Sequence, residues 1–193
     1  IREQDRISVK NQIARQAVSL ISEGSTIFLD GSSTVLCMVN YLRDEQNITV
    51  ITNSLRVATR LCEKRIDVYC TGGKLVPEAL VCVGPYSETM IESMTADLMF
   101  FSSQGLSADG KISDFSESET CQRRQMLQHA RKRYFLCDSS KLGKSFLFTV
   151  CRTSDIDGVI SDIDVSEWLE TGSLPAQQAG GTANASSVIM PGS

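Results

Sequence analysis

The sequence predicts an α/β fold with a mainly parallel sheet and helices on both faces. Short apolar runs of strand length alternate with segments in which apolar residues recur at helical spacing. The strand runs, such as residues 26–30 and 96–102, are nearly continuous in apolar residues, which is typical of strands buried on both faces. The length of 193 residues, 41% of them hydrophobic, is enough for one ordinary domain with its own core.

The alternation gives the expected elements in order. Strands are expected over residues 26–30, 48–52, 67–71, 79–84, 96–102, 133–138, 146–151 and 157–162. Helices are expected over residues 13–21, 34–43, 55–62, 85–94 and 118–131. A helical turn around Trp168 follows the last of these strands.

We expect a single domain over residues 8–170. Residues 1–7 are polar and mixed in charge and are expected to be a linker remnant. Residues 171–193 are rich in Gly, Ala, Ser and Gln, which predicts a flexible tail, although segment 187–190 suits an edge strand. Without an export signal or an apolar run of the roughly 18–20 residues that cross a bilayer, the chain is expected to be cytoplasmic, with no membrane partner.

Charge and composition argue against several classes of function. The net charge of −4 and the pI near 5.1 disfavour nucleic-acid binding by this chain, because such proteins carry a basic patch. The basic residues Arg123, Arg124 and 131–133 are interpreted as a solvated helix face. Seven cysteines without a CxxC spacing and one histidine, His129, disfavour a metal site and histidine-based acid–base chemistry.

Small, polar or glycine-rich loops follow five of the expected strands. Ligands of an open parallel sheet bind outside the carboxyl ends of its strands, so these loops are expected to meet at one edge. One such loop alone would be explained by ordinary turn chemistry, but five are harder to explain in that way. The loops cover residues 30–34, 52–54, 71–73, 104–107 and 138–141.

The loop after the first strand suits a phosphate monoester. Gly31 permits a tight turn there, and Ser32, Ser33 and Thr34 then offer adjacent hydroxyls at the start of a helix. A helix start favours an anion, but a serine that only caps the helix explains this loop equally well. Neither GxxxxGK[ST] nor GxGxxG occurs, which disfavours ATP and NAD, and no cofactor is expected.

Two further charged residues stand at strand ends. Lys141 is suited to meet a phosphate or a sugar carbonyl oxygen, or else it is a solvated loop lysine. Asp30 either accepts hydrogen bonds from sugar hydroxyls or caps its own loop. Gly72 and Gly73 carry no chemistry themselves, but they permit a ligand to approach the backbone closely.

Several motifs, in a fixed order, resemble the effector-sensing domain of the DeoR family of bacterial transcriptional repressors. The resemblance spans roughly residues 11–162. It includes IARQAVSLISEGSTIFLDGSSTVLCMVNYL, ITVITNSLRVATRL, VYCTGGKL, QRRQML and YFLCDSSKLGKSFLFTV. The resemblance implies a fold similar to sugar-phosphate isomerases and CoA-transferase-like proteins, with a phosphorylated sugar sensed rather than converted.

Family motifs can be placed on individual positions of this chain. Gly31, Ser32 and Arg123 depart from the residues that are usual in the family, whereas Arg124 and Met126 match a helix motif. The ligand-binding residues that the resemblance implies, together with the rest of the first loop, are Asp30, Gly31, Ser32, Ser33, Thr34, Thr52, Asn53, Gly72, Gly73, Gly105 and Lys141.

The leading hypothesis is a non-enzymatic sensing domain of a transcriptional regulator. It would bind a phosphorylated sugar, form a homo-oligomer, and contact operator DNA only through an N-terminal winged helix-turn-helix that the sequence lacks. The alternative is a sugar-phosphate isomerase or deaminase-like enzyme on the same fold, for which Asp97 or Glu119 would be the base. A structural module with an empty crevice is the third hypothesis.

Overall fold

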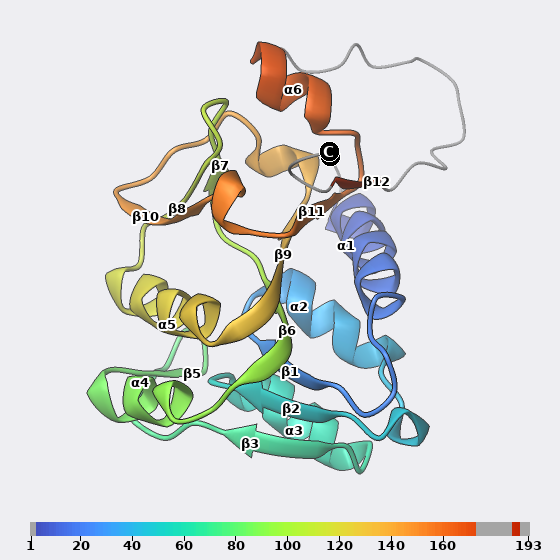
Figure 1. Cartoon of the computed structure of the whole chain (residues 1–193), viewed down its shortest axis with the longest axis vertical. Coiled ribbons are helices and arrows are strands. Elements are labelled where there is room, and N and C mark those ends of the chain that lie inside the picture. Colours follow the sequence, from blue (N-terminus) through green and yellow to red (C-terminus); the bar gives the residue numbers. More distant parts are fainter. Residues whose placement is uncertain (1–2, 173–186, 190–193) are drawn as a thin grey trace.

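The computed structural model describes residues 3–172 and 187–189 (Figure 1). The helices are α1 (Glu3–Val18), α2 (Ser33–Met38), α3 (Leu55–Glu63), α4 (Pro85–Glu92), α5 (Glu117–Gln128) and α6 (Ser166–Thr171). The strands are β1 (Thr26–Leu29), β2 (Thr49–Thr52), β3 (Asp67–Cys70), β4 (Lys74–Val76), β5 (Val81–Val83), β6 (Ala96–Phe101), β7 (Gly105–Leu106), β8 (Lys111–Asp114), β9 (Ala130–Cys137), β10 (Phe148–Arg152), β11 (Gly158–Ser161) and β12 (Ser187–Ile189).

The main sheet confirms the predicted α/β class. It has seven strands in the order β12-β11-β9-β6-β1-β2-β3. All neighbours pair in parallel except β12, which runs antiparallel to β11. The pairing of β12 confirms the edge strand expected near residues 187–190, while 173–186 and 190–193 of the expected tail lie outside the described residues.

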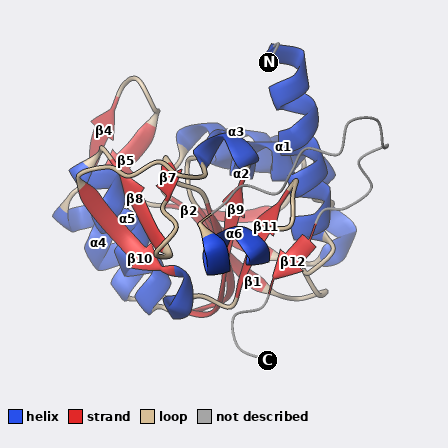
Figure 2. Ribbon diagram, turned by 90° about the horizontal axis from the view of Figure 1, so that it is seen from above, coloured by secondary structure: helices blue, strands red, loops and turns tan. Residues whose placement is uncertain are grey.

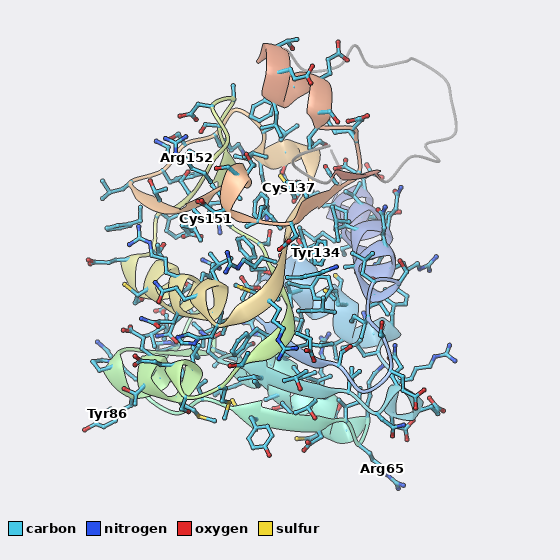
Figure 3. The ribbon with its side chains drawn as sticks, viewed as in Figure 1. Arg65, Tyr86, Tyr134, Cys137, Cys151 and Arg152 are labelled. Carbon is cyan, nitrogen blue, oxygen red and sulfur yellow. The ribbon has the colours of Figure 1, made fainter. Side chains whose placement is uncertain are left out.

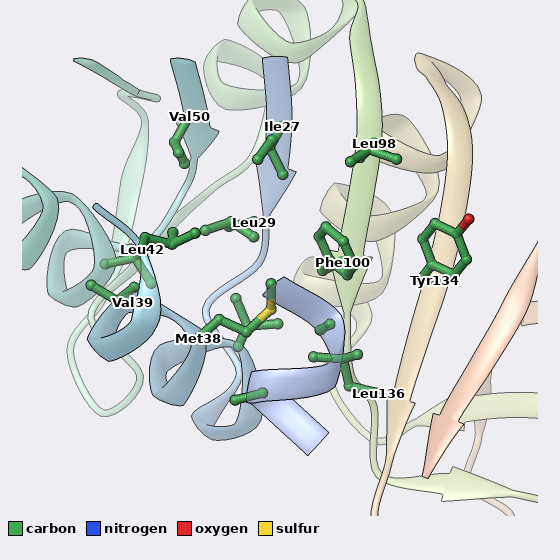
Figure 4. Packing of buried hydrophobic residues seen from close by; sticks show 14 of the residues in the cluster. Ile27, Leu29, Met38, Val39, Leu42, Val50, Leu98, Phe100, Tyr134 and Leu136 are labelled. Carbon is green, nitrogen blue, oxygen red and sulfur yellow. The ribbon is translucent and has the colours of Figure 1, made fainter. Parts of the chain in front are cut away.

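Helices cover both faces of this sheet, and each face has its own core (Figure 2). On one face α1, α2 and α3 pack over side chains such as Ile27, Leu29 and Phe100 (Figure 4). On the other face α4, α5 and α6 pack over side chains that include Phe28 and Phe101. Successive residues of a strand point to opposite faces, so a strand buried on both must be apolar throughout.

Two small antiparallel sheets were only partly predicted. Strands β10, β8 and β7 form one sheet, and β4 and β5 form a hairpin. The expected strand over 79–84 contains β5, and the expected strand over 146–151 covers all of β10 except its last residue, whereas β4, β7 and β8 were not expected. These strands have two to four residues, which is too short for an apolar period to be recognised.

The first helix begins earlier than the sequence suggested. Residues 3–7, which were expected as part of a linker, form the first turns of α1, so the boundary at residue 7 falls inside a continuous helix. Figure 2 shows that this end of α1 projects from the body of the domain. No helix among the described residues is long and apolar enough to span a membrane.

The basic cluster does not form one solvated helix face, and that interpretation was wrong. Arg123 lies on α5 with its side chain 5% exposed, while its neighbour Arg124 is exposed. Residues 131–133 belong to strand β9 and not to the helix, because α5 ends at Gln128 and His129 caps it.

The cysteines are reduced and mostly packed. All seven are free. Cys137 and Cys151 lie within the domain in Figure 3, whereas Tyr86 and Arg65 project from its surface. Burial raises the pKa of both thiols to about 12, so they behave as small apolar side chains.

Candidate functional site

The carboxyl ends of the parallel strands meet at one edge, as the sequence predicted, and a cavity of about 850 Å³ opens beside them. This volume lies within the range of small-molecule sites. Its walls come from α1, the loops after β1, β6, β9 and β11, and the β4–β5 hairpin. Helix α5 and the loop before it also line the cavity. Charged lining residues are Asp5, Arg6, Lys10, Arg56, Glu78, Glu119, Arg123, Asp138, Lys141, Lys144 and Asp162.

The structure separates the predicted ligand-binding residues into three groups. Gly31, Ser32, Ser33 and Lys141 line the large cavity. Asp30 and Asn53 line only a small adjoining cavity that is too narrow to hold a water molecule and that shares Gly31, Glu119 and Arg123 with the large one. The remaining predicted residues line neither of these two cavities; they are Thr34, Thr52, Gly72, Gly73 and Gly105.

The loop after β1 combines a helix cap with an open hydroxyl. Ser32 caps α2, because its Oγ accepts a hydrogen bond from the amide of Val35 at 3.4 Å. Ser33 does not cap the helix; its Oγ accepts a hydrogen bond from Nζ of Lys10 at 2.9 Å. Thr34 is fully buried, and its hydroxyl has no hydrogen-bond partner among the described residues. The adjacent hydroxyls therefore have three different environments.

Below this loop, Asp30 belongs to a buried ionic network. Its Oδ2 accepts hydrogen bonds from Nε of Arg123 at 2.8 Å and from the amide of Ser102 at 3.2 Å. Its Oδ1 accepts from the amide of Ser32 at 3.0 Å, which is the loop-capping role that the sequence left open. The carboxylate of Asp30 is thus engaged on both oxygens by groups of the protein itself.

Arg123 joins three carboxylates across the floor of the cavity. Besides Asp30, its Nη1 donates to Oδ2 of Asp114 at 3.0 Å and its Nη2 lies 3.4 Å from Oε2 of Glu119. Burial alone would lower the pKa of Arg123, but the charges of Asp30 and Asp114 outweigh it and raise the pKa. The guanidinium therefore stays charged, as its three partners require.

Glu119 is the most exposed member of this network and lines the large cavity. Its side chain is 24% exposed, compared with 3% for Asp30 and Asp114. Burial raises the pKa of Glu119, and the nearby charge of Arg123 only partly opposes this shift. Glu119 is therefore the carboxyl group of this network that is most accessible from the cavity.

Lys141 lines the same cavity as Ser33 and lies on the loop after β9. Its Nζ donates to Oγ of Ser102 at 2.5 Å and lies 3.9 Å from Oδ2 of Asp138. Burial lowers the pKa of Lys141, although the charge of Asp138 acts in the other direction. The loop is held in place by Asp162, which accepts hydrogen bonds from the amide and the hydroxyl of Ser139, each at 2.8 Å.

Gly105 does not line the cavity, but its close backbone contact with Lys144 helps to place this second lysine there. A Cβ at this position would lie 2.4 Å from the carbonyl oxygen of Lys144, so only glycine lets the two backbones pass this closely. The amide of Gly143 donates to the carbonyl of Leu106 at 2.9 Å and fixes the same contact. Lys144 itself lines the cavity.

Sequence reasoning missed several lining residues and misplaced one. Arg6 and Lys10 lie in a polar stretch without an apolar period, so no helix was expected to carry them there. Asp97, which was considered as a base, lies at the amino end of β6 and accepts a hydrogen bond from the amide of Thr26 at 2.9 Å. It is therefore at the edge of the sheet opposite the cavity, and only Glu119 of the two acids reaches the cavity.

Comparison with known proteins identifies the family. Residues 5–163 match the model described as the DeoR C terminal sensor domain. The chain is 31% identical over 164 residues to the HTH-type transcriptional regulator GolR of Listeria innocua, covering 84% of this chain and 65% of that protein. It is 33% identical over 159 residues to the lactose phosphotransferase system repressor of Staphylococcus epidermidis, covering 81% and 62%. The chain thus spans just under two-thirds of the length of these relatives.

A solved structure supports the fold. A D-ribose-5-phosphate isomerase in complex with phospho-erythronic acid matches with a TM-score of 0.52 at 14% identity, covering 69% of this chain and 52% of that one. This likeness confirms the sugar-phosphate-isomerase-like fold that the motifs implied. The sequence and family matches go further: the chain belongs to the DeoR family, and residues 5–163 are its C-terminal sensor domain.

Proposed function

We propose that the cavity at the carboxyl edge of the sheet binds a phosphorylated sugar or a closely related metabolite as an effector. The observation that carries this proposal is the pairing of Lys10 with Ser33 on one wall and the placement of Lys141 on another, all lining one cavity of about 850 Å³. Lysine ammonium groups and a hydroxyl are ordinary ligands of a phosphate monoester.

The mixture of charges around the cavity suits a molecule with one anionic end. Arg6, Lys10 and Lys144 offer positive charge to a phosphate. Glu119 and Asp138 offer carboxylate oxygens, which accept hydrogen bonds from sugar hydroxyls. A polyanion without hydroxyls would meet repulsion from these carboxylates, whereas a phosphorylated sugar satisfies both kinds of group.

The effector would control DNA binding by another part of the regulator. The relatives named above are a transcriptional regulator and a repressor, and each is longer than the matched region. We propose that DNA is contacted by the N-terminal part of such a protein and that this domain senses without catalysing a reaction. The likeness to an isomerase concerns the fold alone, because the identity is 14%.

A thermal-shift screen tests the proposal. Pentose and hexose phosphates are added to the protein, each beside its unphosphorylated sugar. A molecule that binds only the folded state stabilises it by about 2.7 kcal/mol at 100 times its Kd, which is seen as a rise in Tm. We expect at least one phosphorylated sugar to raise Tm and its unphosphorylated counterpart to do so much less.

The same samples distinguish sensing from catalysis. NMR spectra of the sugars after incubation should show them unchanged. Turnover of a sugar phosphate would contradict a purely sensing role, and the absence of a Tm shift with every phosphorylated compound would contradict the binding proposal itself.

A further inference from the structure

We propose that the first turns of α1 form a movable wall of the cavity, in which Lys10 and Arg6 hold the anionic group of the effector. Ligand binding in the cavity would then change the position and the order of this helix. The inference rests on the proposed function, because it requires an anionic ligand in the cavity. It adds a contact surface and a means of transmission that the predicted ligand-binding residues do not include.

The two halves of α1 are held very differently. In the C-terminal half, Ile13, Ala14 and Ala17 are fully buried in the core, and Oδ1 of Asn11 accepts a hydrogen bond from the hydroxyl of Tyr41 at 3.0 Å. In the N-terminal half, residues 4–8 are exposed. Figure 2 shows this half projecting from the body of the domain. A segment with few buried contacts is the part of a helix that can change position at low cost.

One side of α1, from the exposed turn to the half-buried Val9 that packs against the core, faces the cavity. Asp5, Arg6, Val9 and Lys10 all line it. Residues four apart lie one above the other on a helix, so these two adjacent pairs form a continuous stripe. The stripe presents two cations to the same space that Ser33 borders.

Within the described part of the chain, neither cation of this stripe forms an ion pair, although the carboxylate of Asp5 belongs to the same stripe. Nζ of Lys10 donates to the neutral hydroxyl of Ser33. Lys141 and Lys144 add positive charge to the cavity. An anion between α1 and these lysines would be attracted from both sides, so it would draw the projecting half of the helix against the domain.

The position of α1 suits it to transmit this change. The matched family model describes a sensor at the C-terminal end of its proteins and begins at residue 5, inside α1. We therefore infer that, in the longer relatives, the corresponding helix connects the sensor domain to the part of the protein that precedes it. A ligand that fixes Arg6 and Lys10 also fixes the direction in which the N-terminal end of this helix leaves the domain, and with it the placement of whatever precedes the helix.

Hydrogen exchange with variants tests the inference. The probes are inorganic phosphate and the sugar phosphate that gives the largest Tm shift in the screen. We expect the amides of residues 6–10 to exchange about tenfold more slowly with the sugar phosphate bound. We expect Lys10→Met to weaken its binding at least about tenfold, because a charged hydrogen bond is lost, and to abolish the protection. Arg15→Met is the matched control, since Arg15 lies on the same helix over the ring of Tyr41 and should bind like the parent.

The outcomes separate this inference from the proposed function. If Lys141→Met weakens the sugar phosphate but Lys10→Met binds it like the parent, without loss of α1 protection, the cavity binds and the inference about α1 is wrong. If no compound of the screen binds the parent, the proposed function fails and the inference fails with it. All three Met variants are compared with the parent by Tm first, so that a folding defect is not counted as a binding defect.

Discussion

The floor of the cavity and its rim are both rich in charge, but they use that charge differently. On the floor, Arg123 is surrounded by Asp30, Asp114 and Glu119 at 2.8–3.4 Å, and the first two carboxylates are almost completely buried. On the rim, the cations Arg6 and Lys10 from α1 form no ion pair with a carboxylate of the described residues, although Asp5 lies beside them. The floor satisfies its own charges and so fixes the shape, whereas the rim leaves charge available to a ligand.

The loop after β1 contributes residues both to the floor and to the rim. Asp30 and Ser32 belong to the floor, where they support the loop after β1. Ser33 belongs to the rim, beside Lys10. From the sequence, a helix cap and a ligand contact were alternative interpretations of the whole loop. In the structure Ser32 is the cap, whereas Ser33 lies at the cavity and accepts a hydrogen bond from Lys10.

The largest expected effect comes from breaking the floor. Arg123→Met should lower the free energy of unfolding by about 3–5 kcal/mol, because it leaves buried carboxylates without their cation. Urea unfolding measures the loss. The matched control is Arg131→Met: Arg131 is 74% exposed and pairs with Asp97 at 3.4 Å, so its loss should cost less than about 1 kcal/mol. Equal effects of the two variants would refute the contrast between floor and rim.

The contact that ties the rim loop to the sheet should come next. Gly105→Ala should destabilise by about 1–3 kcal/mol, because its Cβ collides with the backbone of Lys144. Gly72→Ala is the control, since no atom lies within 4 Å of a Cβ at that position. Differential scanning calorimetry of the two variants should show a clear decrease of Tm for Gly105→Ala alone; similar melting of both would mean that the close approach does not constrain the loop.

The neighbouring hydroxyls of Ser33 and Thr34 allow a comparison in which a single polar atom is removed from the rim or from the buried side of the loop. Ser33→Ala should weaken a phosphorylated sugar by about three- to tenfold, because it removes a rim hydrogen bond worth roughly 1 kcal/mol. Thr34→Val should leave binding unchanged and should not destabilise the fold, because the buried hydroxyl it removes has no partner among the described residues. Calorimetric titration and urea unfolding of both variants check this, and the reverse pattern would place the ligand on the buried side of the loop.

The smallest expected effect is a dependence on pH. Burial lowers the pKa of Lys141 from its ordinary value of 10.5, so this lysine loses its proton at a lower pH than an exposed one. Affinity for a phosphorylated sugar should therefore fall as the pH rises from 7 towards 10.5. In Lys141→Met the part of this fall that Lys141 causes should be missing. A parent and a variant with the same pH profile would show that Lys141 does not meet the phosphate.

The fold and the sheet edge at which the candidate cavity lies could be predicted from the sequence, but the contacts among its residues could not. Continuously apolar strands require a parallel sheet, and a parallel sheet brings loops such as 30–34 and 138–141 to one edge. The ion pair of Asp30 with Arg123 joins residues 93 positions apart, and no local pattern indicates it. Arg123 and Arg124 look alike in sequence, yet adjacent residues of a helix face different directions, and only the first is buried.

The contrast between floor and rim leads to one main expectation: the lysines that line the cavity bind the phosphate of a sugar phosphate. Calorimetric titration of the parent and of Lys141→Met, each with the sugar phosphate that stabilises the parent most and with its unphosphorylated sugar, tests it most directly. We expect the parent to prefer the phosphorylated form and the variant to lose at least about tenfold in affinity for it, while the weak binding of the free sugar hardly changes. Equal affinity of the parent for both forms, or a variant that binds the phosphorylated form like the parent, would contradict it.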